Sequence, residues 1–230
     1  MTSGPLRDTQ PPGPGASAPP LHEYHLRFGE RSWVVEHSGA VLSFLEEQRF
    51  LGSQAGRAPY GVILWPAAIA LAHDVLARAD TAPRARVLEL GAGTGLPGIV
   101  ASTLGAHVVQ SDRHEAAMAL CRSNGERNSA RSIEYRLADW TEWTDDDRYD
   151  WILGSDILYA ERLHPDLRRI FERNLAPGGR LLLSDPFRSP SLRLLEAMER
   201  DGWMVSVTKW TIEGDAEPRP IGVYEVAAPR

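Results

Sequence analysis

Short apolar runs alternate with longer segments of helical character between residues 65 and 226, and this alternation leaves few architectures open to the chain. The apolar runs predict strands at residues 85–90, 107–111, 133–137, 151–154, 180–184, 203–209 and 222–226. The segments between them predict helices at residues 67–79, 96–104, 115–123, 165–175 and 191–200. Strands separated by helices of about 10–15 residues pair in parallel through right-handed crossovers, with helices on both faces of the sheet. The sequence therefore predicts an α/β fold in one domain.

The N-terminal part of the chain has a different character. Residues 1–20 hold six of the 17 prolines and few apolar side chains, which predicts a disordered tail. We expect the folded domain to occupy residues 21–230, with an N-terminal preface at 21–60 and the core at 61–230. Within the preface, the sequence predicts two strands at 24–29 and 31–37 and a helix at 41–47.

Charge and hydropathy exclude several classes of protein. The chain carries 25 lysines and arginines against 31 aspartates and glutamates, so its formal net charge is −6. Broad binding of nucleic acid or of an acidic membrane surface requires a basic face, which this balance disfavours. No apolar run approaches the roughly 20 residues of a membrane span, and the first residues lack the apolar core of a signal peptide. We therefore predict a cytoplasmic protein.

The residues that commonly bind metals are not arranged for it. The seven histidines show no ligand spacing, and the single cysteine, Cys121, cannot form a disulfide or a multi-thiolate site within the chain. We predict no metal, and we expect Cys121 to be a small buried side chain in a helix. The acidic run at residues 145–147 is predicted to be a solvated loop.

A glycine-rich segment, VLELGAGTGLPG at residues 87–98, links a predicted strand to a predicted helix. Glycines let the chain turn sharply there and let a ligand approach the backbone. In open α/β sheets, such a loop lies at the carboxyl end of its strand, where ligands bind. The spacing from Gly93 to Gly98 also satisfies the dinucleotide pattern. However, the dinucleotide pattern begins at the first glycine after the strand, which is Gly91. Leu96 then occupies its third glycine position, which counts against a dinucleotide.

The next two strands end in groups that suit an adenosine. Asp112 follows one of them and could accept hydrogen bonds from both ribose hydroxyls. Asp139 and Trp140 follow the other, where a carboxylate and an indole could bind and stack on adenine. Glu89 precedes the glycine loop, and an acid there suits the positive end of S-adenosylmethionine better than a pyrophosphate. These residues favour a methyl donor over a nicotinamide dinucleotide.

Several segments together carry a family resemblance. VLELGAGTGLPG, VVQSD, LADW, YDWILGSD and LAPGGRLLLSD stand in the order found in class I, seven-strand S-adenosylmethionine-dependent methyltransferases. Asp156-Ile-Leu-Tyr159 and the upstream YGVILWPAAIALA narrow the resemblance to the protein lysine methyltransferases marked by Asp-x-x-Tyr. Bacterial relatives of that family are often labelled "predicted nicotinamide N-methyltransferase", and some eukaryotic members modify arginine. The resemblance implies a Rossmann-like sheet of order 3-2-1-4-5-7-6 with its seventh strand antiparallel.

The resemblance also implies which residues form the site. Those expected to bind the cofactor S-adenosylmethionine, with Glu89 added from its position before the loop, are Trp65, Glu89, Gly91, Ala92, Gly93, Asp112, Asp139, Trp140 and Ser155. Asp156 and Tyr159 are expected to face the acceptor and to act in catalysis. Without the family pattern, Asp156 reads as a helix cap or turn acid and Tyr159 as a packing residue.

The predicted function is that of an S-adenosylmethionine-dependent protein N-methyltransferase acting on lysine, or on arginine as some relatives do. The predicted partner is therefore a protein substrate, with no membrane and no nucleic acid. Three alternatives stay open: a small-molecule N-methyltransferase of the nicotinamide type, an RNA methyltransferase, and a non-catalytic domain that binds the cofactor or a protein. Function resides in the site rather than the fold, so each is compatible with the same sheet.

Overall fold

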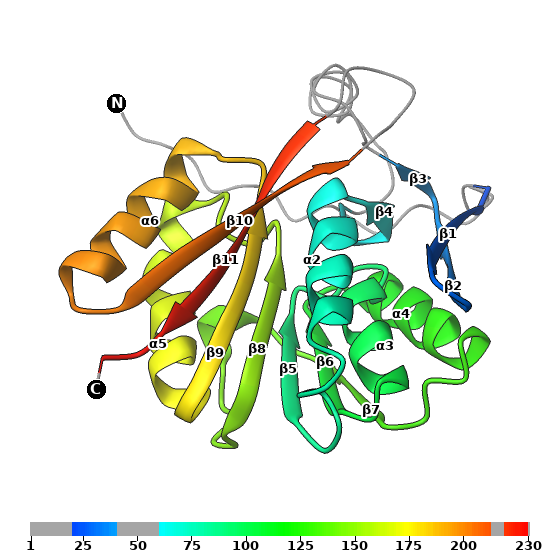
Figure 1. Cartoon of the computed structure of the whole chain (residues 1–230), viewed down its shortest axis with the longest axis horizontal. Coiled ribbons are helices and arrows are strands. Elements are labelled where there is room, and N and C mark those ends of the chain that lie inside the picture. Colours follow the sequence, from blue (N-terminus) through cyan, green and yellow to red (C-terminus); the bar gives the residue numbers. More distant parts are fainter. Residues whose placement is uncertain (1–19, 41–59, 213–218, 230) are drawn as a thin grey trace.

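The computed structural model describes residues 20–40, 60–212 and 219–229. Its centre is a seven-stranded sheet in the order β10-β11-β9-β8-β5-β6-β7 (Figure 1). The strands are β5 (Arg86–Leu90), β6 (His107–Asp112), β7 (Ile133–Leu137), β8 (Tyr149–Ser155), β9 (Leu175–Asp185), β10 (Met204–Ile212) and β11 (Arg219–Ala227). Every strand predicted for this sheet is present.

The direction of the strands follows their connections. The five strands from β5 to β9 pair in parallel, because a helix or a long loop separates each from the next. β11 runs antiparallel to both β9 and β10. Counted in chain order within this sheet, the arrangement is 3-2-1-4-5-7-6 with the seventh strand antiparallel. The predicted fold class and strand order are confirmed.

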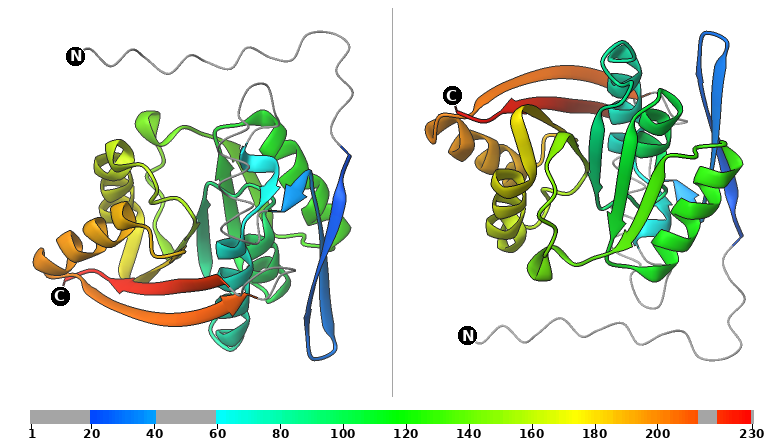
Figure 2. Two further views of the ribbon diagram at one scale, coloured as in Figure 1. Left: turned by 90° about the horizontal axis from the view of Figure 1, so that it is seen from above. Right: turned by 90° about the horizontal axis from the view of Figure 1, so that it is seen from below.

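Helices cover both faces of the sheet (Figure 2). They are α2 (Pro66–Ala77), α3 (Leu96–Thr103), α4 (Glu115–Arg127), α5 (His164–Asn174) and α6 (Ser189–Arg200). Val87 of β5 packs with α2 and α3, whereas its neighbour Leu88 packs with α5 and α6 on the opposite face. Because both faces are buried, these central strands are apolar along their length instead of alternating.

The N-terminal preface forms a hairpin that docks on α4 (Figure 2). Its strands are β1 (His22–Phe28) and β2 (Arg31–His37), both of which were predicted, and they pair antiparallel. The side-chain amide of Asn124 on α4 accepts from Glu36 N at 2.7 Å and donates to Glu36 O at 3.0 Å. Asn128, one turn later, makes the same pair of bonds with Val34. Two asparagines thus take the place of a neighbouring strand for β2.

Some predictions fall beyond the described residues. The tail at 1–20, except its last residue, and the helix at 41–47 lie outside them, and the domain limits stay a prediction. Next to the hairpin, β3 (Gly39–Ala40) pairs in parallel with β4 (Ile63–Leu64), which follows the short helix η1 (Tyr60–Val62). Within the described ranges, no helix has the length and apolar character to span a membrane, and no three metal-binding side chains gather together.

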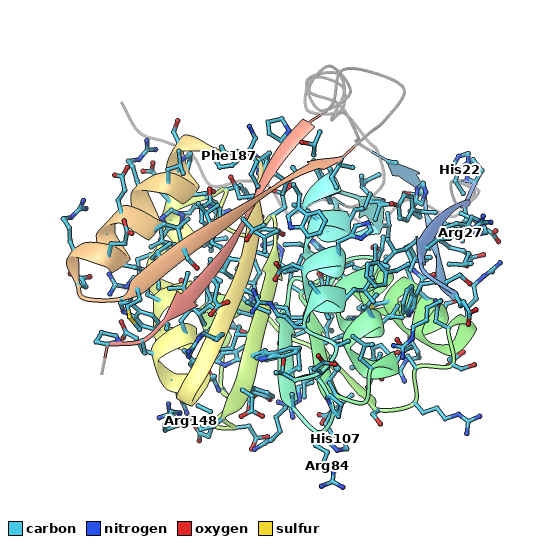
Figure 3. All side chains as sticks on the ribbon, viewed as in Figure 1. His22, Arg27, Arg84, His107, Arg148 and Phe187 are labelled. Atoms are coloured by element: carbon cyan, nitrogen blue, oxygen red, sulfur yellow. The ribbon has the colours of Figure 1, made fainter. Side chains whose placement is uncertain are left out.

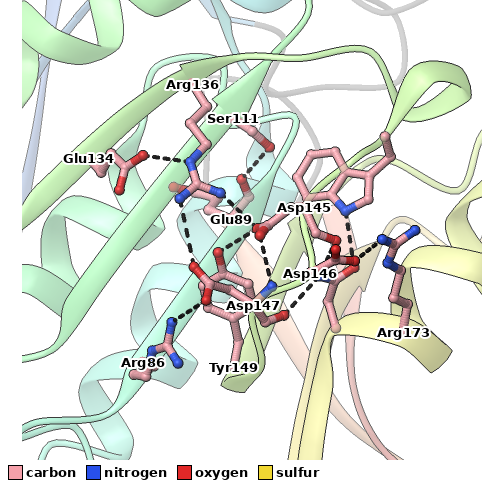
Figure 4. A network of polar contacts seen from close by, with 12 residues as sticks. Arg86, Glu89, Ser111, Glu134, Arg136, Asp145, Asp146, Asp147, Tyr149 and Arg173 are labelled. Atoms are coloured by element: carbon pink, nitrogen blue, oxygen red, sulfur yellow. Dashed lines mark hydrogen bonds and ion pairs between the residues drawn. The ribbon is translucent and has the colours of Figure 1, made fainter.

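The acidic run at residues 145–147 is not simply solvated, which corrects the prediction (Figure 4). Asp145 accepts from the Tyr149 hydroxyl at 2.6 Å and pairs with Arg136 at 2.8 Å, and its side chain is only 10% exposed. Asp146 and Asp147 pair with Arg173 and Arg86. The run therefore ties the beginnings of β5 and β8 to β7 and α5.

Replacing Asp145 with alanine is expected to lower the free energy of unfolding by about 1–3 kcal/mol, because Arg136 and the Tyr149 hydroxyl lose a charged partner in a mostly buried place. That loss corresponds to a drop in Tm of roughly 2–4 °C for each kcal/mol in a chain of this size. Asp146→Ala is the matched control: its side chain is 77% exposed, so we expect a change within about 0.5 kcal/mol. Equal Tm values for the two variants would show that Asp145 has no such role.

Candidate active site

The predicted site residues gather at the carboxyl edge of the parallel strands. Figure 3 shows Phe187, which follows β9, at one end of the sheet. Arg84, His107 and Arg148, which precede or begin strands, lie at the other end. The glycine loop follows β5, Asp112 ends β6 and Ser155 ends β8, so all three belong to the Phe187 end. The acidic run contacts Arg86 and Tyr149, which begin β5 and β8 at the opposite end of the sheet.

The glycine loop is held in a conformation that other residues rarely adopt. Gly91, Gly93 and Gly95 have φ values of 63°, 56° and 80°. A Cβ on Gly91 would lie 3.0 Å from Ile157 Cγ2 and 3.2 Å from Trp140 Cζ2. Two other segments of the site therefore press against this turn. Ala92, between Gly91 and Gly93, is buried against α4 and donates its N–H to Ser111 O at 2.9 Å.

Asp112 connects the loop to the end of β6. One carboxylate oxygen accepts from Gly93 N at 3.2 Å and the other from His114 N at 2.9 Å, and the residue is 7% exposed. A carboxylate has about four acceptor positions, so each oxygen can still accept a hydroxyl. The side chain is thus held in one orientation beside the loop, with acceptor capacity for a polyol.

Glu89 lies beneath the loop, 1% exposed. Its Oε2 accepts from Gly98 N at 3.1 Å and from Gln110 Nε2 at 2.6 Å, while Oε1 is buried without a hydrogen-bond partner among the described residues. Gln110 also accepts from the Cys121 thiol at 3.1 Å. Cys121 is a small buried helical side chain, as predicted. Glu89 thus attaches the first turn of α3 to the sheet from below, and its predicted contact with a ligand stays a prediction.

Replacing Glu89 with glutamine is expected to remove a pH dependence of stability. Burial raises the pKa of Glu89 to about 8, from 4.5 for an ordinary glutamate, so between these values the folded state binds more protons than the unfolded state. The contribution of Glu89 to stability therefore falls as pH rises through this range. Thermal unfolding from about pH 5 to about pH 8 should show Glu89→Gln gaining stability relative to the wild type. A constant difference would mean that Glu89 does not titrate there.

Asp139 and Trp140 form the wall opposite the loop. Asp139 caps the short helix η2 (Trp140–Glu142): its Oδ1 accepts from Thr141 N at 2.9 Å and Thr141 Oγ1 at 2.8 Å. The backbone bond from Thr141 lowers the pKa of Asp139. Capping fixes where η2 begins and so where the Trp140 ring stands against Gly91. Asp139 is therefore a cap in addition to any contact with a ligand.

The segment after β8 carries the predicted acceptor residues. Asp156 has a φ of 58°, unusual for a residue with a side chain, and its N–H donates to Ser184 O at 2.8 Å. Ile157, the next residue, is buried against Gly91, whereas Tyr159 is 53% exposed. Strained backbone of this kind costs about 1–3 kcal/mol and concentrates at functional sites. The turn thus places Asp156 beside the glycine loop and leaves Tyr159 at the surface.

Further contacts hold the start of α2, which Trp65 precedes, at the same edge of the sheet. Trp65 immediately precedes α2, and Ala67 O in the first turn accepts from Ser184 Oγ at 2.8 Å. Since Ser184 also accepts from Asp156 N, one residue of β9 connects the start of α2 to the acceptor turn. On the other side, a Cβ on Gly61 would lie 3.6 Å from Asp112 Oδ2. The structure thus brings all the predicted site residues to one edge of the sheet.

Two charged residues in this place were not predicted as site residues. Arg188 forms an ion pair with both oxygens of Asp156, through Nη1 to Oδ1 and through Nη2 to Oδ2 at 3.2 Å. Asp185, the last residue of β9, is fully buried and lies 3.2 Å from Arg188 Nη1. A signal was present, because Asp185 ends an apolar strand and Arg188 follows it three residues later, at the same edge of the sheet as the other site residues.

The comparisons with known proteins agree with this geometry. Residues 46–192 match the family model described as lysine methyltransferase. Protein N-lysine methyltransferase METTL21A of Xenopus tropicalis is 36% identical over 130 residues, which are 55% of this chain and 60% of that protein. Its counterpart in Danio rerio is 32% identical over 157 residues, or 65% of this chain and 71% of that protein. Histone-arginine methyltransferase METTL23 of Xenopus laevis is 35% identical over 114 residues, 47% of this chain and 49% of that protein.

Solved structures support the fold. Precorrin-6y C5,15-methyltransferase from Geobacter metallireducens superposes with a TM-score of 0.58 at 20% identity, covering 68% of this chain and 87% of that one. The family match spans well over half of the chain and includes the glycine loop, Asp112 and the Asp156 turn. The chain therefore has the class I methyltransferase fold and belongs to the lysine methyltransferase family.

Proposed function

We propose that this protein transfers a methyl group from S-adenosylmethionine to the side-chain amine of a lysine in a protein substrate. One observation carries the proposal: Ile157, the neighbour of Asp156, is packed on Gly91 of the glycine loop. A cofactor held by the loop and an amine held by Asp156 would therefore be neighbours. The family match and the METTL21A relatives support lysine as the acceptor.

The residues present fit this cofactor. Asp112 can accept from ribose hydroxyls, the Trp140 ring offers an adenine a flat apolar face, and the glycine loop presents backbone without side chains. Trp65, Ala92, Asp139 and Ser155 complete the proposed binding set. Glu89 would belong to this set by holding the loop from beneath through its bonds to Gly98 N and Gln110 Nε2. When bound, S-adenosylmethionine supplies an electrophilic methyl group on a sulfonium whose positive charge lowers the pKa of an amine held nearby.

Asp156 and Tyr159 would bind and orient the acceptor. A lysine side chain has a reference pKa of about 10.4 and arrives as an ammonium ion, which must lose a proton before it can act as a nucleophile. Asp156 accepts a hydrogen bond from the ammonium and directs its nitrogen toward the cofactor side. Tyr159 offers an exposed aromatic face that attracts a cation. Holding the reacting atoms about 3–3.5 Å apart is the main contribution of the protein to such a transfer.

The test is transfer of a radiolabelled methyl group from S-adenosylmethionine to an extract of the source cells, separated into protein, RNA and small-molecule fractions. We expect label in protein, recovered as methyl-lysine after hydrolysis and absent with Asp112→Ala. Label confined to small molecules would replace the proposal with a nicotinamide-type N-methyltransferase, and label in RNA with an RNA methyltransferase. If the protein binds S-adenosylhomocysteine but labels no fraction, the non-catalytic reading replaces it.

A further inference from the structure

Asp156 is already bound by a guanidinium group before any substrate arrives. Arg188 contacts Asp156 Oδ1 through Nη1 and Asp156 Oδ2 through Nη2 at 3.2 Å, which is a bidentate pair. The side chains of Arg188 and Asp156 are 22% and 9% exposed, so solvent screens this pair only in part. A substrate that reaches Asp156 therefore meets a carboxylate whose two oxygens already bind the guanidinium of Arg188.

Asp185 fixes Arg188 in this position. Asp185 Oδ1 accepts from the backbone N–H of Arg188 at 2.6 Å, which holds the start of the turn. Asp185 Oδ2 accepts from Ser191 Oγ at 2.7 Å and lies 3.2 Å from Arg188 Nη1. Both oxygens of the buried Asp185 are thus engaged. Asp185 steadies the guanidinium from the end of β9.

The Arg188–Asp156 pair distinguishes between a lysine and an arginine as the acceptor of the methyl group. A carboxylate offers about four acceptor positions, and a bidentate guanidinium occupies one on each oxygen. An ammonium is a compact point charge that can use a single remaining position. A second guanidinium needs two parallel acceptors in one plane, the positions that Arg188 fills. To bind Asp156 in the same bidentate way, an arginine substrate would have to displace Arg188, whereas a lysine would not.

We propose that Arg188 is a specificity-determining residue that admits lysine and rejects arginine by occupying the bidentate face of Asp156. The inference rests on the proposed function and adds to it the choice between two acceptors. The relatives of this chain include proteins named as N-lysine methyltransferases and as histone-arginine methyltransferases. The choice between lysine and arginine therefore has to be made within a common fold. Arg188 acts through Asp156 and is a positioning residue.

The experiment compares the wild type, Arg188→Gln, Arg188→Lys and the control Arg193→Gln. Arg193 lies on α6 of the same segment and pairs with Glu161, with both side chains more than half exposed. Each protein is incubated with deuterium-labelled S-adenosylmethionine and a protein extract of the source cells. Mass spectrometry of the digested proteins then gives the ratio of labelled methyl-lysine to labelled methyl-arginine. Melting temperature and S-adenosylhomocysteine binding are measured alongside.

We expect lysine labelling by the wild type and by Arg193→Gln. Arg188→Gln should lower the lysine-to-arginine ratio by roughly tenfold or more, because both oxygens of Asp156 become available to a guanidinium. Arg188→Lys keeps a charge but not the fork, so its ratio should lie in between.

Several outcomes would overturn the inference. A wild type that labels arginine as readily as lysine excludes it, and so does an unchanged ratio in Arg188→Gln. Loss of all transfer by an Arg188→Gln protein that still folds and binds S-adenosylhomocysteine would show a role in catalysis and not in selection. If Arg188→Gln fails to fold, an unchanged ratio in Arg188→Lys excludes the inference. Failure of the proposed function is distinct, because then the wild type labels neither residue.

Discussion

Asp156→Asn is expected to reduce kcat/KM for methyl transfer by about 100-fold, or ~2.7 kcal/mol of transition-state stabilisation, and to leave cofactor binding unchanged. Asparagine keeps the shape of aspartate and tolerates a positive φ, so the turn at φ 58° should persist. What is lost is the negative charge that would hold the substrate ammonium. A hydrogen bond to a charged group is worth about 1.5–3 kcal/mol, which agrees with a loss of this size.

Steady-state kinetics with a labelled protein fraction measure this effect, and calorimetric titration with S-adenosylhomocysteine provides the binding control. Asp150→Asn is a matched substitution at the opposite end of the sheet, where Asp150 accepts from Arg86 N at 2.8 Å. We expect that variant to keep its turnover. Full activity of Asp156→Asn would sink the assignment of Asp156 to the acceptor site.

Asp112→Ala is expected to weaken cofactor binding by at least about 100-fold. Two proposed hydrogen bonds from ribose hydroxyls to a charged carboxylate would be lost, each worth about 1.5–3 kcal/mol. The loop would also lose its anchor, because Gly93 N and His114 N both donate to this side chain. Methyl transfer should disappear together with binding.

Titration of S-adenosylhomocysteine into the variant measures the Kd directly. Asp201→Ala serves as the control, since Asp201 is an exposed partner of Arg168 far from the glycine loop in sequence and should leave the Kd unchanged. Asp112→Asn preserves the volume and one acceptor atom, so its Kd should fall between those of the wild type and Asp112→Ala. An Asp112→Ala protein that binds like the wild type would contradict the placement of the ribose.

The strands were predictable because both faces of the sheet are buried. Apolar runs bounded by glycines and polar residues predict both ends of β5, β6 and β8 to within about two residues. The end of α4 was less predictable. The predicted helix ends at residue 123, whereas α4 continues to Arg127 through Asn124 and Gly125. Both are weak helix formers, and α4 continues because Asn124 binds β2 and Gly125 leaves room for Tyr135.

The sheet and the gathering of the candidate cofactor residues could be predicted from sequence, because the carboxyl ends of parallel strands meet at one edge. Spacing along the chain therefore places Gly91, Asp112 and Asp139 together. Which charged side chains pair with each other depends instead on how the elements pack. Asp156 and Arg188 are 32 residues apart, and their contact depends on the turn after β8 and the turn after β9 facing each other. The acidic run at residues 145–147 likewise forms ion pairs with arginines of other elements. Hydrophobic periodicity reports which face of an element is buried, whereas an ion pair depends on side-chain positions that exist only once the elements have packed.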